Sequence, residues 1–249
     1  MSQVLMQKDK AFCEIVAKDR RDPLDNKFEA LSKQDEWPKQ WDKDVLYYDV
    51  ITGTKDIKKA IWQRQAVNLM MTMWDIEIDM DLHPLTDEMK EAGIAADIRI
   101  YFKSSLQESY FKDRPATLAF AYYPGQGDIS GIMVFNDDYY WNLTGEEVDA
   151  WKADPIHYTE GDGKKLKGYN FISVGGHEFG HVLGLTHSTR GLGLDLMDPY
   201  YNPDNFLPSM YDILRVLVKY PREQYRRWGS LGMLRKWMRI RILRYKLAI

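Results

Sequence analysis

Three of the five histidines of this 249-residue chain lie in one eleven-residue segment, from His177 to His187. The segment reads H-E-F-G-H-V-L-G-L-T-H and fills every fixed position of the pattern H-E-x-x-H-x-x-G-x-x-H. In a helix, residues four apart lie about 40° apart around the axis and roughly one turn apart along it. His177 and His181 can therefore direct their imidazoles at one metal ion. Glu178 can reach a water molecule on that ion without binding the ion itself.

A glycine three residues after the second histidine, Gly184, predicts the end of this helix. Glycine adopts a left-handed backbone conformation without a Cβ penalty, so the chain can turn there. The turn would bring His187 back as a third nitrogen ligand. Three histidine ligands with an open fourth position are typical of a catalytic zinc site rather than a structural one.

The chemistry that this pattern predicts is metal-assisted hydrolysis of peptide bonds. A zinc ion on the histidines would lower the pKa of its bound water and polarise the scissile carbonyl. Glu178 would accept the proton of the water as general base and return it to the leaving amine as general acid. A degenerate domain that binds metal without activity is the other reading of the same residues. The remaining histidines, His83 and His157, are interpreted as ordinary surface residues.

The composition of the chain excludes a disordered or low-complexity protein, because 45% of the residues are apolar and 13% are aromatic. The single cysteine, Cys13, excludes an internal disulfide framework. The sequence has no run of about 18 apolar residues, so it predicts no transmembrane helix. The N-terminus lacks the apolar stretch of a signal peptide. We therefore expect a chain that is cytoplasmic or carried in a particle such as a virion.

The charge is unevenly distributed, which indicates three parts. The net charge of the chain is −3, but residues 221–249 hold nine Lys or Arg and one acid. The net charge is therefore +8 on this tail and −11 on residues 1–220. Residues 1–43 are interpreted as a polar, partly helical N-terminal extension that packs on the main domain through Phe28, Trp37 and Trp41. Residues 44–220 form the predicted domain.

The expected elements follow the order strand, helix and four strands, and then three further helices. Alternation or β-branched and aromatic residues predict strands, and helical spacing of apolar residues predicts a helix that starts at Thr54. Capping-box sequences at Thr144 and Ser209 predict a short helix and the last helix, and the histidine helix runs from about Phe171 to Gly184. The predicted strands are 45–51, 76–82, 96–102, 117–123 and 131–135. This order favours an α+β architecture.

Together these residues resemble the matrixins, the matrix-metalloproteinase-like branch of the metzincin zinc peptidases, over residues 44–220. The zinc motif carries the resemblance first, and Ser188, directly after the third histidine, has the matrixin form. Residues 118–127 look like the family's edge strand and its following turn, 131–141 like its next strand, and 211–213 like the start of its last helix. The resemblance implies a twisted, mixed, mostly parallel sheet with three main helices, to which this chain adds the extension and a basic C-terminal helix.

The resemblance also implies roles for single residues. Met197 would form the Met-turn beneath the zinc ligands. A substrate would lie extended along the cleft and pair with backbone groups of Leu118 and Ala119, a β-augmentation mode of binding. The stretch from Pro199 to Tyr201 would form one wall of the pocket just past the cleaved bond.

Departures from the family pattern limit what the resemblance implies. Matrixins hold a structural zinc through histidines where this chain has Phe120 and Val134, and Asn136 and Tyr139 replace the acid pair of a family calcium site. These replacements argue against a structural zinc and weaken a calcium site, so one catalytic zinc is the expected cofactor. The family's cysteine-switch sequence is absent, and Cys13 is interpreted first as an inert residue and second as a thiolate latch.

Three functions are compatible with the sequence. The first is an active zinc endopeptidase that takes a peptide or protein substrate. The second is a matrixin-fold assembly component of a larger particle, such as a phage virion, tail or baseplate, with a vestigial or accessory site. The third is an amidase of cell-wall peptide crosslinks. The tail could pack on the domain or dock a protein partner; a membrane surface or nucleic acid is the least favoured contact. Inhibition of the cleft by residues 1–43 is left open.

Overall fold

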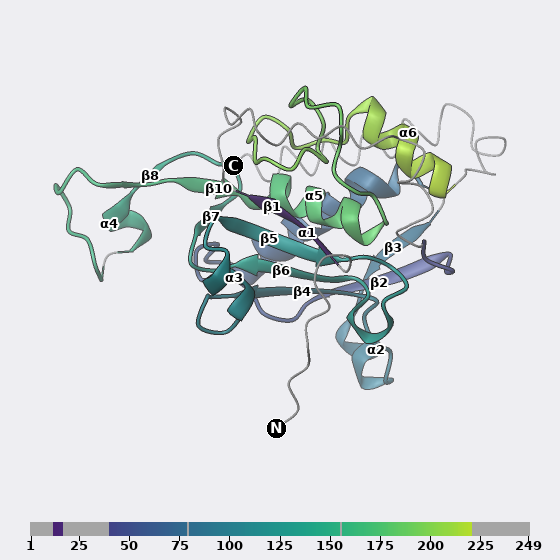
Figure 1. Cartoon of the computed structure of the whole chain (residues 1–249). Helices are drawn as coiled ribbons and strands as arrows, with labels where there is room; N and C mark the ends of the chain where they lie inside the picture. The colour runs from purple at the N-terminus through teal and green to yellow at the C-terminus, as the bar shows by residue number, and fades with distance from the viewer. Residues whose placement is uncertain (1–11, 17–39, 79, 155, 221–249) are drawn as a thin grey trace.

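One six-stranded mixed sheet forms the centre of the computed structural model, which describes residues 12–16, 40–78, 80–154 and 156–220 (Figure 1). The strand order is β1-β5-β6-β4-β2-β3. Strand β2 pairs in parallel with β3 and β4, and β4 pairs in parallel with β6, whereas β5 is antiparallel to both β6 and β1. The strands are β1 (Phe12–Val16), β2 (Val45–Val50), β3 (Asp81–Pro84), β4 (Ile98–Lys103), β5 (Thr117–Tyr122) and β6 (Ile132–Asn136).

Three longer helices accompany the sheet: α1 (Ala60–Asp75), α5 (Phe171–Val182) and α6 (Met210–Lys219). Helices α1 and α5 pack against each other, and α5 lies along β5 and β6 on the same side of the sheet (Figure 1). The predicted α+β class with a mostly parallel mixed sheet and three main helices is therefore confirmed. The short helices are α2 (Asp87–Glu91), α3 (Ser109–Asp113) and α4 (Ala150–Ala153).

Two small sheets connect the main sheet to α5. Strand β7 (Tyr140–Asn142) pairs in parallel with β10 (Gly168–Asn170), which runs directly into α5. Strand β8 (Val148–Asp149) pairs with β9 (Lys165–Leu166), and with α4 they form the lobe at the left of Figure 1. The pairing of β7 with β10 thus fixes where α5 begins.

Two consecutive glycines allow α5 to approach α1 closely. A Cβ added at Gly175 would lie 2.2 Å from the sulfur of Met70, and one at Gly176 would lie 3.0 Å from Cε of Met73. The indole Nε1 of Trp74 donates a hydrogen bond to the carbonyl of Gly176 at 2.9 Å. Each glycine costs a helix interior about 1 kcal/mol relative to alanine. The close packing of the two helices offsets this cost and holds α5 in a fixed position.

The predicted helix start at Thr54 is wrong, because α1 begins at Ala60. The side chain of Gln63 donates to the carbonyls of Thr54 at 2.6 Å and Ile57 at 2.8 Å, and its Oε1 accepts from the backbone N–H of Thr54. These bonds hold residues 54–57 as an irregular segment. A glutamine inside a helical pattern gives no sequence signal of such contacts.

The strand predicted over residues 76–82 is also wrong in its first half. Ile76 caps α1, and the backbone N–H of Ile78 donates to the carbonyl of Trp74 at 3.2 Å, so these residues form a turn. Only the short β3 follows. Ile78 and Met80 are both buried, so the alternation marks burial in a turn rather than a strand.

The short helix predicted at Thr144 does not form. The side-chain oxygen of Asn142 accepts hydrogen bonds from the backbone N–H groups of Thr144 at 3.1 Å and Gly145 at 2.6 Å. The hydroxyl of Thr144 accepts from Glu146, only two residues on. These local bonds form a turn in place of a helix cap.

Of the predicted aromatic anchors of the extension, Trp41 lies within the described residues and Phe28 and Trp37 lie outside them. The indole Nε1 of Trp41 donates to the carbonyl of Val182 at 2.8 Å, and its backbone N–H donates to the hydroxyl of Tyr220 at 3.1 Å. Trp41 therefore joins the ends of α5 and α6. The basic tail, 221–249, lies outside the described residues. Among the helices described, none is long and apolar enough to cross a membrane.

Candidate active site

The helix that carries the first two histidines is fixed at its start and buried along its length. The side-chain oxygen of Asn170 accepts hydrogen bonds from the backbone N–H groups of Ile172 at 2.9 Å and Ser173 at 3.2 Å, as a helix N-cap does. Every residue of α5 is buried, and His177, Glu178 and His181 have an exposed fraction of 0%. The side chains are therefore held in one arrangement by packing.

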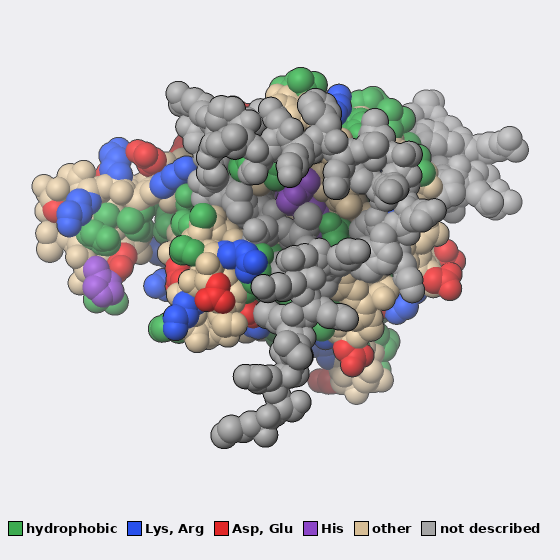
Figure 2. Space-filling view, viewed as in Figure 1, with side chains coloured by type: hydrophobic (Ala, Val, Ile, Leu, Met, Phe, Trp, Pro, Cys, Tyr) green, Lys and Arg blue, Asp and Glu red, His purple; other side chains and the backbone are tan. Residues whose placement is uncertain are grey.

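The structure brings the three histidines of the motif together. Potential ligand atoms of His177, His181 and His187 all lie within 4.8 Å of one another. The Nε2 atoms of His177 and His181 are 3.0 Å apart, and the ring of His187 lies 5.2 Å and 4.9 Å from theirs, centroid to centroid. Histidine side chains reach the face shown in Figure 2 at two places, over α5 and on the lobe of α4 and β8.

Hydrogen bonds to backbone carbonyls set the protonation of two of these rings. Nδ1 of His177 lies 2.7 Å from the carbonyl of Leu196, and Nδ1 of His181 lies 2.6 Å from that of Leu185. A carbonyl only accepts, so each Nδ1 carries the proton and each Nε2 presents a lone pair. Two lone pairs 3.0 Å apart repel each other unless a cation lies beside them. The donor set therefore fits a metal ion held by neutral imidazoles.

Burial keeps the two helical histidines uncharged. Burial is the largest cause and the nearby His187 ring the second; together they lower the pKa of His177 to about 3, although the hydrogen bond to Leu196 acts in the opposite direction. Burial likewise lowers the pKa of His181 well below its usual value. Both rings are therefore ready to bind a metal ion at neutral pH without first losing a proton.

These pKa shifts predict that the metal-free protein loses stability in mild acid. Between pH 6.5 and pH 3 the unfolded chain binds a proton on His177 that the folded chain does not, so the free energy of unfolding falls as pH falls. From pH 7 to pH 5, His177 alone removes about 2 kcal/mol. Urea unfolding of chelator-treated protein at both pH values measures the loss. The loss should shrink in His177→Asn, and an equal loss in that variant would contradict the assignment.

The predicted turn after the helix is present. Gly184 has a φ of 86°, its N–H donates to the carbonyl of His181 at 2.8 Å, and the N–H of Leu185 donates to the carbonyl of Gly180 at 2.9 Å. The chain leaves the helix in the left-handed conformation and returns His187 towards the other two rings. This conformation favours glycine over every other residue.

Gly184→Ala is expected to lower both stability and metal affinity. A left-handed alanine costs roughly 1–2 kcal/mol, and relief of that strain moves His187. Zinc titration and thermal unfolding measure the two effects. Gly93→Ala is the matched control, because Gly93 has a φ of 82° with no atom within 4 Å of an added Cβ. Gly93→Ala should lower stability without lowering zinc affinity. Equal zinc affinity in both variants would contradict the prediction.

A buried aspartate that the sequence did not indicate holds the loop after His187. Asp195 accepts hydrogen bonds from the hydroxyls of Ser188 at 2.5 Å and Ser209 at 2.6 Å, and it forms an ion pair with Arg190. Burial raises the pKa of Asp195, but the hydrogen bonds from these three partners outweigh burial and leave it below the usual value. A charged Asp195 therefore fixes the residue next to His187 to the N-terminus of α6.

Met197 lies against the histidine helix, and the residue before it orients His177. Met197 is buried, and a Cβ at Gly180 would lie 2.3 Å from its sulfur. Its carbonyl accepts from the N–H of Ser188 at 2.6 Å. Asp212, whose pKa is raised by burial, accepts from the N–H of Leu196 at 2.9 Å. The carbonyl of Leu196 is the partner of His177, so α6 supports the position of His177 indirectly.

The residues expected to contact substrate lie in two places. Leu118 and Ala119 are in β5 and fully buried, and Ala119 lies opposite Ile15 of β1. Pro199 is partly buried. The hydroxyl of Tyr201 accepts from the backbone N–H of Asn170 at 2.9 Å. Tyr201 thus helps to hold the start of α5, a contact that sequence reasoning did not predict.

Another aromatic residue that the sequence did not single out adjoins the cluster. The ring of Tyr123, just after β5, meets the ring of His181 edge to face at 5.7 Å between centroids. Tyr123 therefore packs directly against one histidine of the cluster. The pattern around Tyr123 predicts only a strand end before a turn, so no sequence signal marks this contact.

The positions where the family places additional metals are filled by protein contacts. Phe120 and Val134 are buried in a cluster with Tyr110 and Phe111. The side-chain nitrogen of Asn136 donates to the carbonyl of Thr117 at 3.0 Å. In the same region, the hydroxyl of Tyr139 donates to the carbonyl of Pro115 at 2.6 Å. Neutral donors and aromatic packing thus hold this region together.

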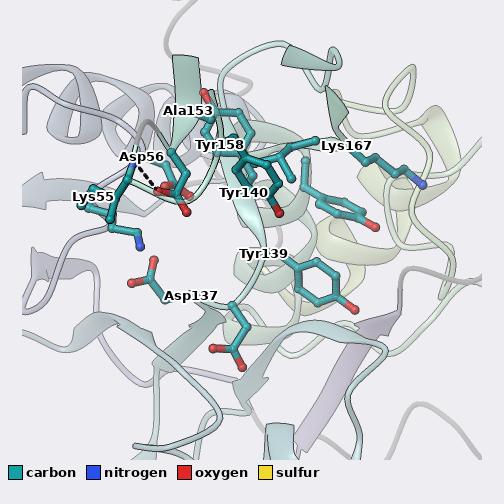
Figure 3. Close-up of a pocket in the computed structure, with 13 residues that line it drawn as sticks. Lys55, Asp56, Asp137, Tyr139, Tyr140, Ala153, Tyr158 and Lys167 are labelled. Carbon is teal, nitrogen blue, oxygen red and sulfur yellow. Dashed lines mark hydrogen bonds between the residues drawn. The ribbon is translucent and has the colours of Figure 1, made fainter. Parts of the chain in front are cut away.

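A separate hollow of about 490 Å³ lies beside the lobe of α4 and β8 (Figure 3). None of the three histidines lines it. Its walls include Asp56 and Asp137 together with tyrosines and lysines, and burial raises the pKa of both aspartates. The hollow is therefore a different place from the histidine cluster.

A histidine-glutamate helix beside a mixed sheet, a left-handed glycine turn and a buried methionine beneath the ligands define a metzincin-type peptidase fold. The sequence profile described as matrixin matches residues 40–218, so the chain belongs to the matrixin family. Human matrilysin is 31% identical over 179 residues, which are 70% of this chain and 56% of matrilysin. Horse stromelysin-1 is 32% identical over 165 residues, which are 66% of this chain and 28% of stromelysin-1.

Human matrix metalloproteinase-17 is 30% identical over 166 residues, which are 66% of this chain and 23% of that protein. The chain therefore matches between about a quarter and three fifths of the length of these curated relatives. The matched range is close to the predicted domain of residues 44–220. The division into three parts, and the roles of single residues, stay predictions.

Proposed function

We propose that this chain is a zinc-dependent endopeptidase. The observation that carries the proposal is the position of Glu178 directly after His177 in the buried helix α5, beside three histidines with ligand atoms within 4.8 Å. A purely structural metal site needs no carboxylate at this position. Membership in the matrixin family supports the same class of chemistry.

The residues divide into ligands, a proton carrier and a support. His177, His181 and His187 would hold the zinc ion, which when bound lowers the pKa of a water molecule and polarises a carbonyl. The carboxylate of Glu178 accepts a proton from the attacking water and delivers it to the nitrogen of the leaving amine. Met197 supports the ligands from below. Burial of α5 excludes competing water from the carboxylate.

The proposed substrate is a peptide segment in extended conformation. It would pair with the outer edge of β5 at Leu118 and Ala119, and its side chain just past the cleaved bond would meet Pro199 and Tyr201. The relatives named above are matrix metalloproteinases and related peptidases, which supports a peptide or protein substrate. No observation favours the assembly role in a virion or similar particle, so it remains an alternative reading of the sequence.

Cleavage of a broad quenched-peptide library by the purified, zinc-loaded chain tests the proposal. We expect cleavage that a chelator abolishes and that zinc restores. The cleaved sequences would define the preference of the pocket. One bound zinc per chain without any cleavage, both in the wild type and in the variants that free β5 described below, would contradict the proposal and favour a binding role.

A further inference from the structure

The edge of β5 that the proposed substrate needs is already paired with another strand. Strand β1, from the N-terminal extension, runs antiparallel to β5. Cys13 lies opposite Ala121, Glu14 opposite Phe120, and Ile15 opposite Ala119. The register shifts after Ile15, so that Val16 lies opposite Thr117. The pairing therefore covers the stretch that contains Leu118 and Ala119.

This pairing leaves β5 without a free edge. A strand has two hydrogen-bonding edges, and β5 uses one for β6 and the other for β1. Ala119 shows both contacts, with Phe135 of β6 on one side and Ile15 of β1 on the other. A substrate strand cannot add to β5 while β1 is in place.

Strand β1 also lies beside the helix of the histidines. Cα atoms of β1 and α5 approach within 8 Å, as do those of β5 and α5 (Figure 1). A peptide that adds to the outer edge of β5 would likewise lie beside α5, the helix that carries His177 and His181. Strand β1 therefore occupies the place that an extended substrate would take, along the sheet edge and beside the helix of the histidines.

We propose that strand β1, residues 12–16, occupies the edge of β5 to which a substrate would pair. In this position it keeps the peptidase inhibited until it leaves β5. The proposal rests on the proposed function and assigns its regulation to backbone pairing. A segment of the same chain has an effective concentration on the order of millimolar at its binding edge. A substrate at micromolar concentration competes poorly with it, so release of β1 should lower the apparent KM.

The first test weakens the pairing in the full-length, zinc-loaded chain. Alternate N–H groups of a strand point to the same neighbour, so one of two consecutive N–H groups faces β5. Glu14→Pro with Ile15→Pro therefore removes one donor to β5, whichever of the two residues supplies it. Glu14→Ala with Ile15→Ala is the matched control, because it shortens the same side chains and keeps both donors. We expect kcat/KM to rise at least about tenfold in the proline pair relative to the alanine pair.

Amide hydrogen exchange of residues 117–122 shows whether β5 is exposed in the same proteins. The proline pair should exchange faster there than the alanine pair. Faster exchange with unchanged kcat/KM would overturn the proposal, since the edge would then be free without effect on cleavage. Unchanged exchange would also overturn it, because it would mean that β1 does not protect this edge.

The second test locks the strand in place and does not depend on a destabilised variant. Residues directly opposite each other in an antiparallel pair have Cβ atoms about 4.5–5.5 Å apart, close to the range that a disulfide bridges. Cys13 is the only cysteine of the chain, so Ala121→Cys provides one partner at the opposite position. Oxidised glutathione should form the disulfide and lower cleavage at least about tenfold, and a phosphine reductant should restore it.

The double variant Cys13→Ser with Ala121→Cys is the control, and oxidation should not change its activity. Failure of the disulfide to form would contradict the register. A disulfide that forms and leaves cleavage unchanged would contradict the inhibition. Each result bears on the strand rather than on the zinc chemistry, because the same protein is compared before and after oxidation.

A binding measurement separates this proposal from the proposed function. A labelled peptide with the sequence of residues 10–18 should bind the proline pair at least about tenfold more tightly than the wild type, because only the variant offers a free edge. Equal binding would overturn the strand proposal even if every protein cleaves peptides. Selective binding without any cleavage would support the strand proposal and contradict the endopeptidase.

Discussion

Glu178→Ala is expected to lower kcat/KM for a cleaved peptide by about 10²–10⁴-fold without loss of the metal ion. Glu178 has an exposed fraction of 0% and follows His177 in α5, so its side chain is held by the packing of the helix rather than by a flexible loop. Alanine removes the proton acceptor but none of the three imidazoles. The effect should therefore fall on kcat, with KM nearly unchanged.

Glu178→Gln is the matched variant for this prediction. Glutamine keeps the size and shape of the side chain but cannot carry the proton. The glutamine variant should therefore lose as much activity as the alanine variant. Zinc content measured on the same samples should stay at that of the wild type. Activity of Glu178→Gln within tenfold of the wild type would mean that another group moves the proton.

The local part of the site could be predicted from the sequence, because the motif itself encodes its geometry. The spacing of His177 and His181 follows from the helical period, and Gly184 adopts the left-handed conformation that the motif requires. The capping box of the last helix is present as expected, with Ser209 and Asp212 bonded to each other's backbone. These features depend on residues close together in the chain.

The supports of the site could not be predicted, because they join segments far apart in the chain. Asp195 reaches Ser209, and Asp212 reaches Leu196, whose carbonyl orients His177. An aspartate in a loop or in a helix cap has the same local signal whether or not it makes such contacts. The position of Tyr123 against His181 depends on tertiary packing in the same way.

The pairing of β1 with β5 is the clearest case of information that the sequence lacked. Residues 12–16 have no sequence pattern that predicts which strand they pair with, and β5 is more than a hundred residues away along the chain. The errors at residues 54–59 and 76–82 have a related cause. Gln63 and the turn after α1 use side-chain and backbone bonds that local periodicity does not report.

His187→Ala is expected to reduce zinc affinity more than the loss of any supporting hydrogen bond does. His177 and His181 are held by α5, and their Nδ1 atoms bond to carbonyls, so the pair survives the change. His187, the proposed third ligand, comes from the loop after Gly184, and the cluster found among the described residues holds only these three histidines. Loss of an outer hydrogen bond to a ligand costs about 10–100-fold in metal affinity, so we expect more than 100-fold here.

Asp195→Ala provides the comparison, because it leaves all three imidazoles and removes the anchor of Ser188. We expect it to lower zinc affinity by about 10–100-fold, since His187 then loses its fixed approach. His157→Ala, on the exposed lobe, should leave zinc affinity unchanged. Competition titrations with a zinc indicator measure all three. If His187→Ala binds zinc as the wild type does, the metal is held by only two residues of this motif, and the open-site geometry on which the endopeptidase depends is lost.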